Sequence, residues 1–360
     1  MKKLRLSKTS RTNLFTYALV IAAFVVMQVL IATGTLSYSM RGQLVPICVY
    51  IVLAVSLNLV VGISGELSLG HAGFMGVGAF TGAVVSSVLQ ASLPDPTVRL
   101  VAAMVVGGIM AGIMGVVIGI PVLRLRGDYL AIVTLAFGEI LRNVINNLYI
   151  GFDETGLRIA LSEEALHLAA GGKMVLTGPR GTTGIQTIAT FTAGFVLVLV
   201  TLFVVLNLIH SKEGRAIKAC RDNRIAAEAV GINATVFKLK AFVVSAFLAG
   251  MAGALFGLNY ASISASKFSF TTSIDILVFV VLGGMGNILG SVISATLLYI
   301  LPEAMRGLQD YRMIMYAVVL IIVMLCTWSP KIKGTLTLFA SEIQDRLRKL
   351  LGRKEAGTNE

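Results

Sequence analysis

The sequence is poor in charged residues. Aspartate, glutamate, lysine and arginine make up 13% of its 360 residues, against roughly 25% in soluble domains, whereas hydrophobic residues make up 56%. So little polar surface excludes an ordinary water-soluble domain of this length. The apolar residues also arrive in blocks close to the ~20 residues that cross a bilayer. The composition therefore indicates a polytopic membrane protein.

Cysteines are few, and the sequence has no recognisable nucleotide-binding or catalytic motif. Cys48, Cys220 and Cys326 lie far apart and give neither a metal-binding spacing nor a disulfide framework, so no metal site is predicted. No Walker A motif is present, and the nearest approach, Gly171-Gly172-Lys173-Met174, lacks the first glycine and the hydroxyl residue. No constellation of histidine, acid and cysteine suggests an enzyme. We expect no enzymatic activity and no cofactor, with any ATP bound by partner subunits.

The basic residues, which outnumber the acids, lie where membrane proteins carry them. The segments 1–13, 210–240 and 329–360, with Arg124 and Arg126, hold 21 of the 30 lysines and arginines. Basic residues flanking apolar spans are typical of cytoplasmic loops and not of nucleic-acid binding. We therefore expect no nucleic-acid partner, contact with membrane lipid, and all these segments on one side of the membrane.

The apolar blocks predict a transmembrane domain over 14–328, between a basic N-terminus, 1–13, and a tail, 329–360. The blocks are 14–33, 44–62, 67–89, 100–120, 129–148, 190–209, 241–263, 274–301 and 311–328. Block 274–301 is too long for one perpendicular helix and is interrupted by glycines at 283–286, so it predicts two crossings or one broken helix. Two crossings give an all-α fold of about ten transmembrane helices, with both termini on the cytoplasmic side.

Two segments share one pattern. Gly76–Ser86 and Gly284–Ser294 both read G-x-G-x-x-x-G-small-V-aliphatic-S. Transporters are often built from repeats with the pathway at their interface. The echo predicts an internal inverted repeat, although glycine-rich helices can also resemble each other by chance. The candidates for pathway lining or helix packing are Gly70, His71, Gly76, Gly78, Gly82, Glu139, Gly284, Gly286 and Gly290.

Two readings stay open for each of these candidates. The glycines line a pathway or let helices approach closely. His71 contacts solute or a coupling surface, or it is a polar residue satisfied at a helix end. Glu139 contacts substrate, or it pairs with Arg142 three residues later on the same helical face.

The basic loop 210–240 predicts a short, exposed helix. Asp222-Asn223 can cap a helix over Arg224–Val230, Gly231 can end it, and Asn233 or Thr235 can cap the next membrane helix. A helix of two turns cannot bury an apolar face by itself. We therefore expect it to dock on a partner surface.

Three motifs resemble those of a known family. Glu228-Ala229-Val230-Gly231, following Gly214–Asn223, resembles the cytoplasmic loop of ABC importer permeases. Gly65–Phe74 is similar to the early motif of the branched-chain amino acid branch, and Gly127–Ile140 looks like the motif of its LivM-type subunit. The likeness runs over about residues 44 to 328. It departs at Ser291, where the family often has proline, and in a long polar segment, 150–187.

The resemblance implies the permease subunit of an ABC importer in the bacterial cytoplasmic (inner) membrane. Such a subunit translocates branched-chain or related amino acids, driven by ATP hydrolysis on partner subunits. The implied partners are a second LivH-like permease, two ABC ATPase subunits and an extracytoplasmic solute-binding protein. The residues it implies for ATPase coupling are Arg215, Arg221, Asp222, Arg224, Glu228, Ala229 and Gly231. The rival interpretation is a secondary carrier or channel, whose uptake would persist without any ATPase.

Overall fold

The computed structural model describes residues 8–34, 37–90, 92–125, 128–153, 156–166 and 172–304, with positions 314, 317, 318 and 321. The chain forms two compact units, 1–299 and 300–360, and the second contributes mainly the last turn of one helix to the described residues. The predicted tail, 329–360, and most of the last predicted block, 311–328, lie outside them.

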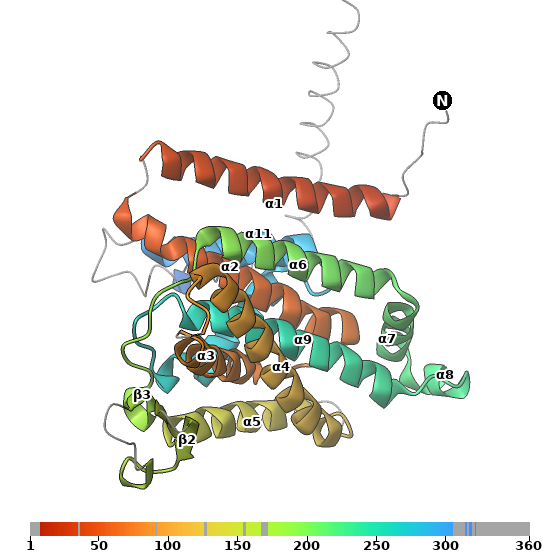
Figure 1. Cartoon of the computed structure of the whole chain (residues 1–360). Coiled ribbons are helices and arrows are strands. Elements are labelled where there is room, and N and C mark those ends of the chain that lie inside the picture. Colours follow the sequence, from red (N-terminus) through yellow and green to blue (C-terminus); the bar gives the residue numbers. More distant parts are fainter. Residues whose placement is uncertain are drawn as a thin grey trace, which may run out of the picture. The chain divides into compact units, whose positions relative to one another are not determined.

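Seven helices are long and apolar enough to cross a membrane, and two shorter apolar helices follow within the described ranges (Figure 1). The long ones are α1 Lys8–Ala32, α2 Tyr38–Asn58 with its π-helical extension η1 Leu59–Ser64, α3 His71–Val88, α4 Pro96–Val122, α5 Asp128–Asn146, α6 Phe191–His210 and α9 Ala234–Gly257. The shorter ones are α10 Phe270–Gly283 and α11 Ile288–Ala304, and two polar helices, α7 Lys212–Asp222 and α8 Arg224–Ala229, join α6 to α9. The predicted multi-pass helical membrane protein is confirmed.

Close backbone packing holds α3, α4 and α9 together. A Cβ added at Gly78 would lie 2.0 Å from the carbonyl oxygen of Gly250, and one at Gly253 would lie 2.0 Å from that of Met75. In a membrane, helices gain from such van der Waals contact, since lipid is as apolar as the side chains. The opposite face of α4 is apolar and exposed, with Val105, Ile109 and Val117 each at least 40% accessible, as suits a surface in contact with lipid.

The block interrupted at Gly283 is a helical hairpin. Ser294 on α11 donates a hydrogen bond to the carbonyl oxygen of Phe279 on α10, and a Cβ at Gly290 would lie 1.8 Å from the carbonyl oxygen of Gly283. These two pairs converge towards the turn, so α10 and α11 run antiparallel. α10 has 14 residues, which at 1.5 Å per residue is about 21 Å, shorter than the ~30 Å hydrocarbon core.

The fold is mostly helical, which corrects the all-α prediction. A three-stranded antiparallel sheet in the order β2-β1-β3 occupies much of the polar segment 150–187. Its elements are β1 Tyr149–Asp153, β2 Gly156–Ala160 and β3 Lys173–Thr177, with single 3-10 turns η2 Glu164–Leu166, η3 Gly178–Arg180 and, after α9, η4 Ala265–Phe268. The N–H of Thr182 donates to the carbonyl oxygen of Ile263 at 2.9 Å, which ties this segment to the connection between α9 and α10.

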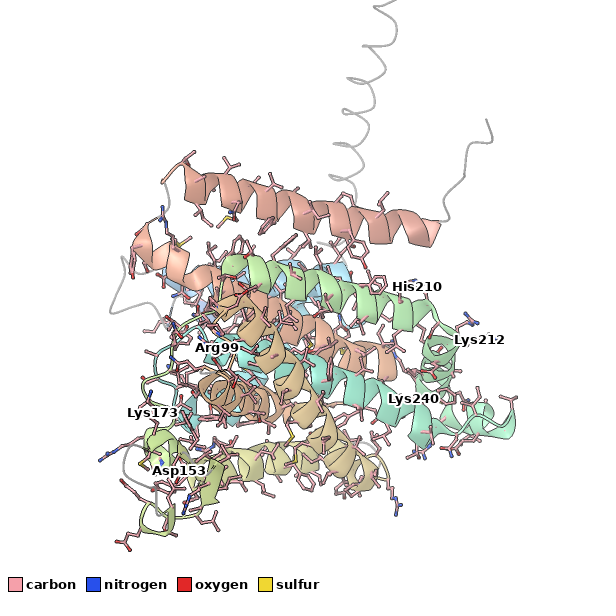
Figure 2. The ribbon with its side chains drawn as sticks, in the orientation of Figure 1. Arg99, Asp153, Lys173, His210, Lys212 and Lys240 are labelled. Atoms are coloured by element: carbon pink, nitrogen blue, oxygen red, sulfur yellow. The ribbon has the colours of Figure 1, made fainter. Side chains whose placement is uncertain are left out.

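The two ends of the helical unit differ. We call the end that carries α7, α8 and the Gly284–Asn287 turn the loop end, and the end that carries the three strands the sheet end. Figure 2 shows His210 and Lys212 at the loop end, and Asp153 and Lys173 at the sheet end.

An inverted repeat built on the two similar segments is not supported. The first copy lies wholly within α3, whereas the second begins in the turn before α11. α3 begins at His71, and the N–H of Ala72 donates to the hydroxyl of Ser273 near the start of α10, whereas α11 follows the hairpin turn directly. The two copies therefore have different structural settings, and no repeat is shown.

Candidate functional site

Side-chain caps shape the loop end. The Ser211 hydroxyl accepts the N–H of Gly214 at 3.1 Å and begins α7, and the Asn223 side chain accepts the N–H of Ala226 at 3.0 Å and begins α8. Each cap satisfies a backbone donor that the first helical turn leaves open. The predicted role of Asn223 is confirmed.

Glycine ends α8 as the sequence predicts. Gly231 has φ +86°, its N–H donates to Glu228, and the N–H of Ile232 donates to Ala227, both at 3.0 Å. This paired arrangement is the Schellman ending, which favours glycine because a side chain strains a left-handed residue. α8 ends at Ala229, one residue earlier than predicted, and Asn233 caps α9.

α8 has a packed inner face and an open outer one. Ala227 is buried against Cys220 of α7 and Ala234 of α9. Removal from water raises the pKa of the Cys220 thiol above its ordinary value. Ile225 and Val230 on the other side are 81% and 76% exposed. The described chain thus leaves an apolar surface on a helix that is fixed from behind.

Most of the predicted coupling residues lie on the surface around α8. Arg224 and Glu228 form an exposed ion pair one turn apart, with Nε and Oε1 2.8 Å from each other. Arg215, Asp222 and Ala229 are exposed as well. Arg224, Glu228 and Ala229 belong to α8, whereas Arg215 and Asp222 lie on α7.

Arg221 behaves differently from the rest of that group. Its Nη1 donates to the carbonyl oxygen of Gly62, on η1, at 2.5 Å. Its side-chain stem lies over Gly65, where an added Cβ would be 2.8 Å from the arginine Cγ. The resemblance implies a role in ATPase coupling for Arg221, and in the structure its side chain joins α7 to the end of α2.

The end of α2 widens into a π-helix. η1 covers Leu59–Ser64, and the N–H of Glu66 reaches back to the carbonyl oxygen of Val60 at 3.1 Å. A Cβ at Gly62 would lie 1.8 Å from Oδ1 of Asn58 and 2.3 Å from the backbone nitrogen of Gly286. Only glycine fits this contact between α2 and the hairpin turn.

The Asn58 amide fastens the hairpin turn to α2. Its Oδ1 accepts the N–H of Gly286 at 2.8 Å, and its Nδ2 donates to the carbonyl oxygen of Asn287 at 3.1 Å and the hydroxyl of Ser291 at 2.7 Å. Asn58 is fully buried, so these bonds replace its contacts with water. They give Ser291 a hydrogen-bonding role at the position where the sequence departs from the family pattern.

A nearly buried ion pair adds a third connection at the loop end. Lys238 on α9 pairs with Glu66, and their side chains are 10% and 16% exposed. We call the Arg221–Gly62, Glu66–Lys238 and Asn58–Gly286 contacts the loop-end links. They connect α7, α9, the end of α2 and the α10–α11 turn. No sequence motif indicated a role for Lys238.

The remaining glycine candidates lie at close contacts between segments. Added Cβ atoms would lie 2.2 Å from the carbonyl oxygen of Thr134 at Gly70, 3.2 Å from Phe268 at Gly76 and 2.6 Å from Ala254 at Gly82. Like Gly78 and Gly290, these positions support the packing interpretation. Gly284 and Gly286 instead shape the turn, with φ +90° and +86°.

His71 and Glu139 both have partners within the protein. His71 is buried, and its Nε2 lies 2.9 Å from the hydroxyl of Ser56. Oε2 of Glu139 lies 2.7 Å from Nε of Arg142, and its Oε1 accepts the N–H of Phe270 at 3.1 Å, at the start of α10. Both arrangements support the structural interpretation of these residues, with Glu139 joining α5 to α10.

The fold and the loop end together define a class: a multi-pass membrane permease with a short exposed helix on one end. Residues 39–326 match the family described as "Branched-chain amino acid transport system / permease component", and the chain belongs to this family. It is the permease component of a branched-chain amino acid ABC transport system and not itself an enzyme.

Individual relatives agree with this family. The chain is 33% identical to the high-affinity branched-chain amino acid transport system permease protein LivM of Escherichia coli, over 90% of this chain and 75% of the relative. It is 25% identical to the permease protein LivH of the same organism, over 77% of this chain and 88% of the relative. None of the solved structures matches the chain.

Proposed function

We propose that this permease forms half of a translocation pathway for branched-chain or related amino acids, and that a LivH-like permease forms the other half. Relatives named both LivM and LivH support a paired arrangement. In this assembly two ABC ATPases bind the loop end, and an extracytoplasmic binding protein delivers solute to the sheet end. ATP is held by the ATPases, in keeping with a sequence that has no Walker A motif.

The loop end faces the cytoplasm in this proposal. The basic loop 210–240 carries seven lysines and arginines, and Lys212 and Lys240 lie at this end (Figure 2). Basic loops stay on the cytoplasmic side during insertion. If the chain makes the ten crossings that the apolar blocks predict, both termini share that side.

The observation that carries the proposal is the outer face of α8. Ile225 on the six-residue helix α8 and Val230, the residue that follows it, have exposed aliphatic side chains, whereas the opposite face of α8 is packed. Such a short helix gains stability from tertiary contact and not from its own length. A groove on an ATPase subunit would cover these side chains, while Arg224 and Glu228 border the contact.

The loop-end links supply a route from the ATPase to the pathway. A shift of α8 moves α7, and Arg221 carries that shift to the carbonyl oxygen of Gly62. Gly62 touches Gly286, and Asn58 binds the same turn. Cycles of ATP binding and hydrolysis would then displace the α10–α11 hairpin relative to α2.

Replacement of Ile225 by glutamate tests this function. The variant should lose most co-purifying ATPase and most ATP-driven amino acid uptake in vesicles, because a charge would be buried in the contact. Ile159→Glu is the matched control: Ile159 is 63% exposed on β2 at the sheet end, so this change should leave ATPase retention unaltered.

Two outcomes would contradict the proposal. The first is an Ile225→Glu protein that retains both ATPase and uptake at the level of the unmodified protein. The second is uptake by the purified chain in vesicles that contain neither ATP nor ATPase, which would favour a secondary carrier.

A further inference from the structure

A cavity of about 550 Å³ opens at the sheet end. Its lining residues include Arg180 after β3, Tyr50 on α2, Tyr299 on α11 and residues of the 260–267 connection between α9 and α10. Ligand pockets for small molecules typically measure about 300–1,000 Å³. The cavity is therefore large enough for a free amino acid together with some of its bound water molecules.

The charged side chains that line this cavity have one sign, while Asp275 of α10 lies close enough to Tyr50 to interact with it electrostatically. Arg180 and Lys267 line it, and no aspartate or glutamate is among its lining residues in the described part of the chain. Neither cation forms an ion pair with a described residue. Two unpaired cations beside one cavity favour a ligand with a carboxylate or another anionic group.

Aromatic rings form the other wall. Tyr50 and Tyr299 have centroids 4.8 Å apart, and Phe256 and Tyr260 have centroids 5.1 Å apart, in an edge-to-face contact. All four rings line the cavity. They offer apolar surface to an aliphatic side chain, and their faces attract a cation such as an ammonium group.

The rim of the cavity is held by hydrogen bonds between its segments. The hydroxyl of Thr272, at the start of α10, donates to the carbonyl oxygen of Lys267 at 2.8 Å. Thr182 and Ile263 form an isolated antiparallel bridge between the sheet segment and the 260–267 connection. These contacts hold the segment that carries Arg180 against the connection that carries Lys267.

We propose that this cavity is the entry site for the transported amino acid. The carboxylate binds Arg180 and Lys267, the ammonium group lies against a tyrosine face, and the aliphatic side chain contacts Phe256 and the remaining rings. This inference rests on the proposed import function, and it assigns a solute site to this subunit that does not depend on the binding protein.

The position of the cavity links it to the loop end. Tyr50 belongs to α2, which ends at Asn58 and η1, while Thr272 and Tyr299 belong to α10 and α11, whose turn is bound by Asn58. The cavity and the loop-end links therefore share α2, α10 and α11. Displacement of the hairpin relative to α2 alters the cavity walls.

The test is binding of radiolabelled L-leucine to the protein purified from native membranes with its accompanying subunits, in the absence of binding protein. The double variant Arg180→Gln, Lys267→Gln should bind leucine at least about tenfold more weakly, since it lacks both charge-assisted contacts. Leucinamide, which has no carboxylate, should compete poorly for the unmodified site. Lys173→Gln, an exposed cation at the same end, is the matched control and should bind leucine normally.

Each contrary result has a distinct meaning. Unchanged leucine binding by the double variant overturns the proposal. A second contrary result is a double variant whose uptake is impaired at low concentrations of binding protein and normal at saturating concentrations. That result would make Arg180 and Lys267 a docking surface for the binding protein and would also overturn the proposal. A defect seen only with anionic phospholipid present would assign them to a lipid headgroup and also overturn it. Co-purification of the ATPase subunits with the double variant is measured in parallel. If the ATPases are retained, each of these three results concerns the cavity and not the proposed import function.

Discussion

Among single residues, Gly62 has very little room for a side chain. Its missing side chain lets the end of α2 touch the backbone of Gly286, and Asn58 Oδ1 occupies the space beside it. We predict that Gly62→Ala destabilises the protein by about 1–3 kcal/mol or more, as overpacked sites do. The thermal midpoint in detergent, followed by size-exclusion chromatography, measures the effect.

Gly42→Ala supplies the comparison within the same helix. A Cβ at Gly42 meets nothing within 4 Å, so this change should leave the thermal midpoint unaltered or raise it slightly. Equal midpoints for the two variants would show that the close approach at Gly62 is not needed for the fold.

Roles of single residues could be predicted from the sequence where their hydrogen-bond partners lie only a few residues away along the chain. Asn223, Gly231 and Asn233 act within a few residues of themselves, and their side-chain or backbone chemistry determines the position of a helix end. The partners of Arg221 and Glu66 lie 159 and 172 residues away in the chain. Nothing in a local pattern identifies such pairs, because the fold alone brings them together.

Among the elements, α9 is joined to the segment after η1 through the Glu66–Lys238 pair. Breaking a buried pair leaves an uncompensated charge and costs about 3–5 kcal/mol, whereas exposed pairs contribute at most about 1 kcal/mol. We predict that Glu66→Gln and Lys238→Gln each lower stability markedly, and that the double variant recovers much of the loss. A double-mutant cycle on thermal stability measures the coupling.

The exposed pair of Lys240 and Glu213 is the control for that cycle. Their side chains are 45% and 44% accessible, so their coupling should be small. Coupling of the same size in both pairs would contradict the view that burial makes the Glu66–Lys238 contact important.

Elements were predictable where their length or composition was distinctive. The hairpin break followed from glycines inside an apolar block too long for one crossing. The sheet was missed because its strands have five residues each and lie in a polar segment. A signal was present in the alternation of Leu157, Ile159 and Leu161 with smaller or charged residues, which is the period of a strand.

For the whole molecule, the testable property is its orientation in the membrane. Lys212 and Lys173 lie at opposite ends and are both exposed (Figure 2). In a variant lacking the native cysteines, Lys212→Cys should react with an impermeant maleimide only in inverted vesicles, and Lys173→Cys only in intact spheroplasts. Labelling of both from one side would refute the positive-inside assignment.

The class of protein could be predicted from the sequence because the bilayer constrains the length and polarity of every span. The packing of the spans against each other could not be predicted in this way. Close contacts such as Gly78 with Gly250 depend on which small residues face each other, and many glycines in the sequence offer alternatives. Composition therefore identifies the membrane environment of the chain, whereas the structure is needed to show which helices contact each other.

The π-helical end of α2 determines the direction in which the chain leaves this helix. A π-turn holds one residue more than an α-turn, and one residue corresponds to a rotation of about 100° around the helix axis. Without that extra residue, the segment from Gly65 onwards would leave α2 on a different side, and Glu66 would point away from Lys238. The one additional residue in the π-turn thus rotates the start of the Gly65–Phe74 motif towards α9, so that Glu66 can pair with Lys238.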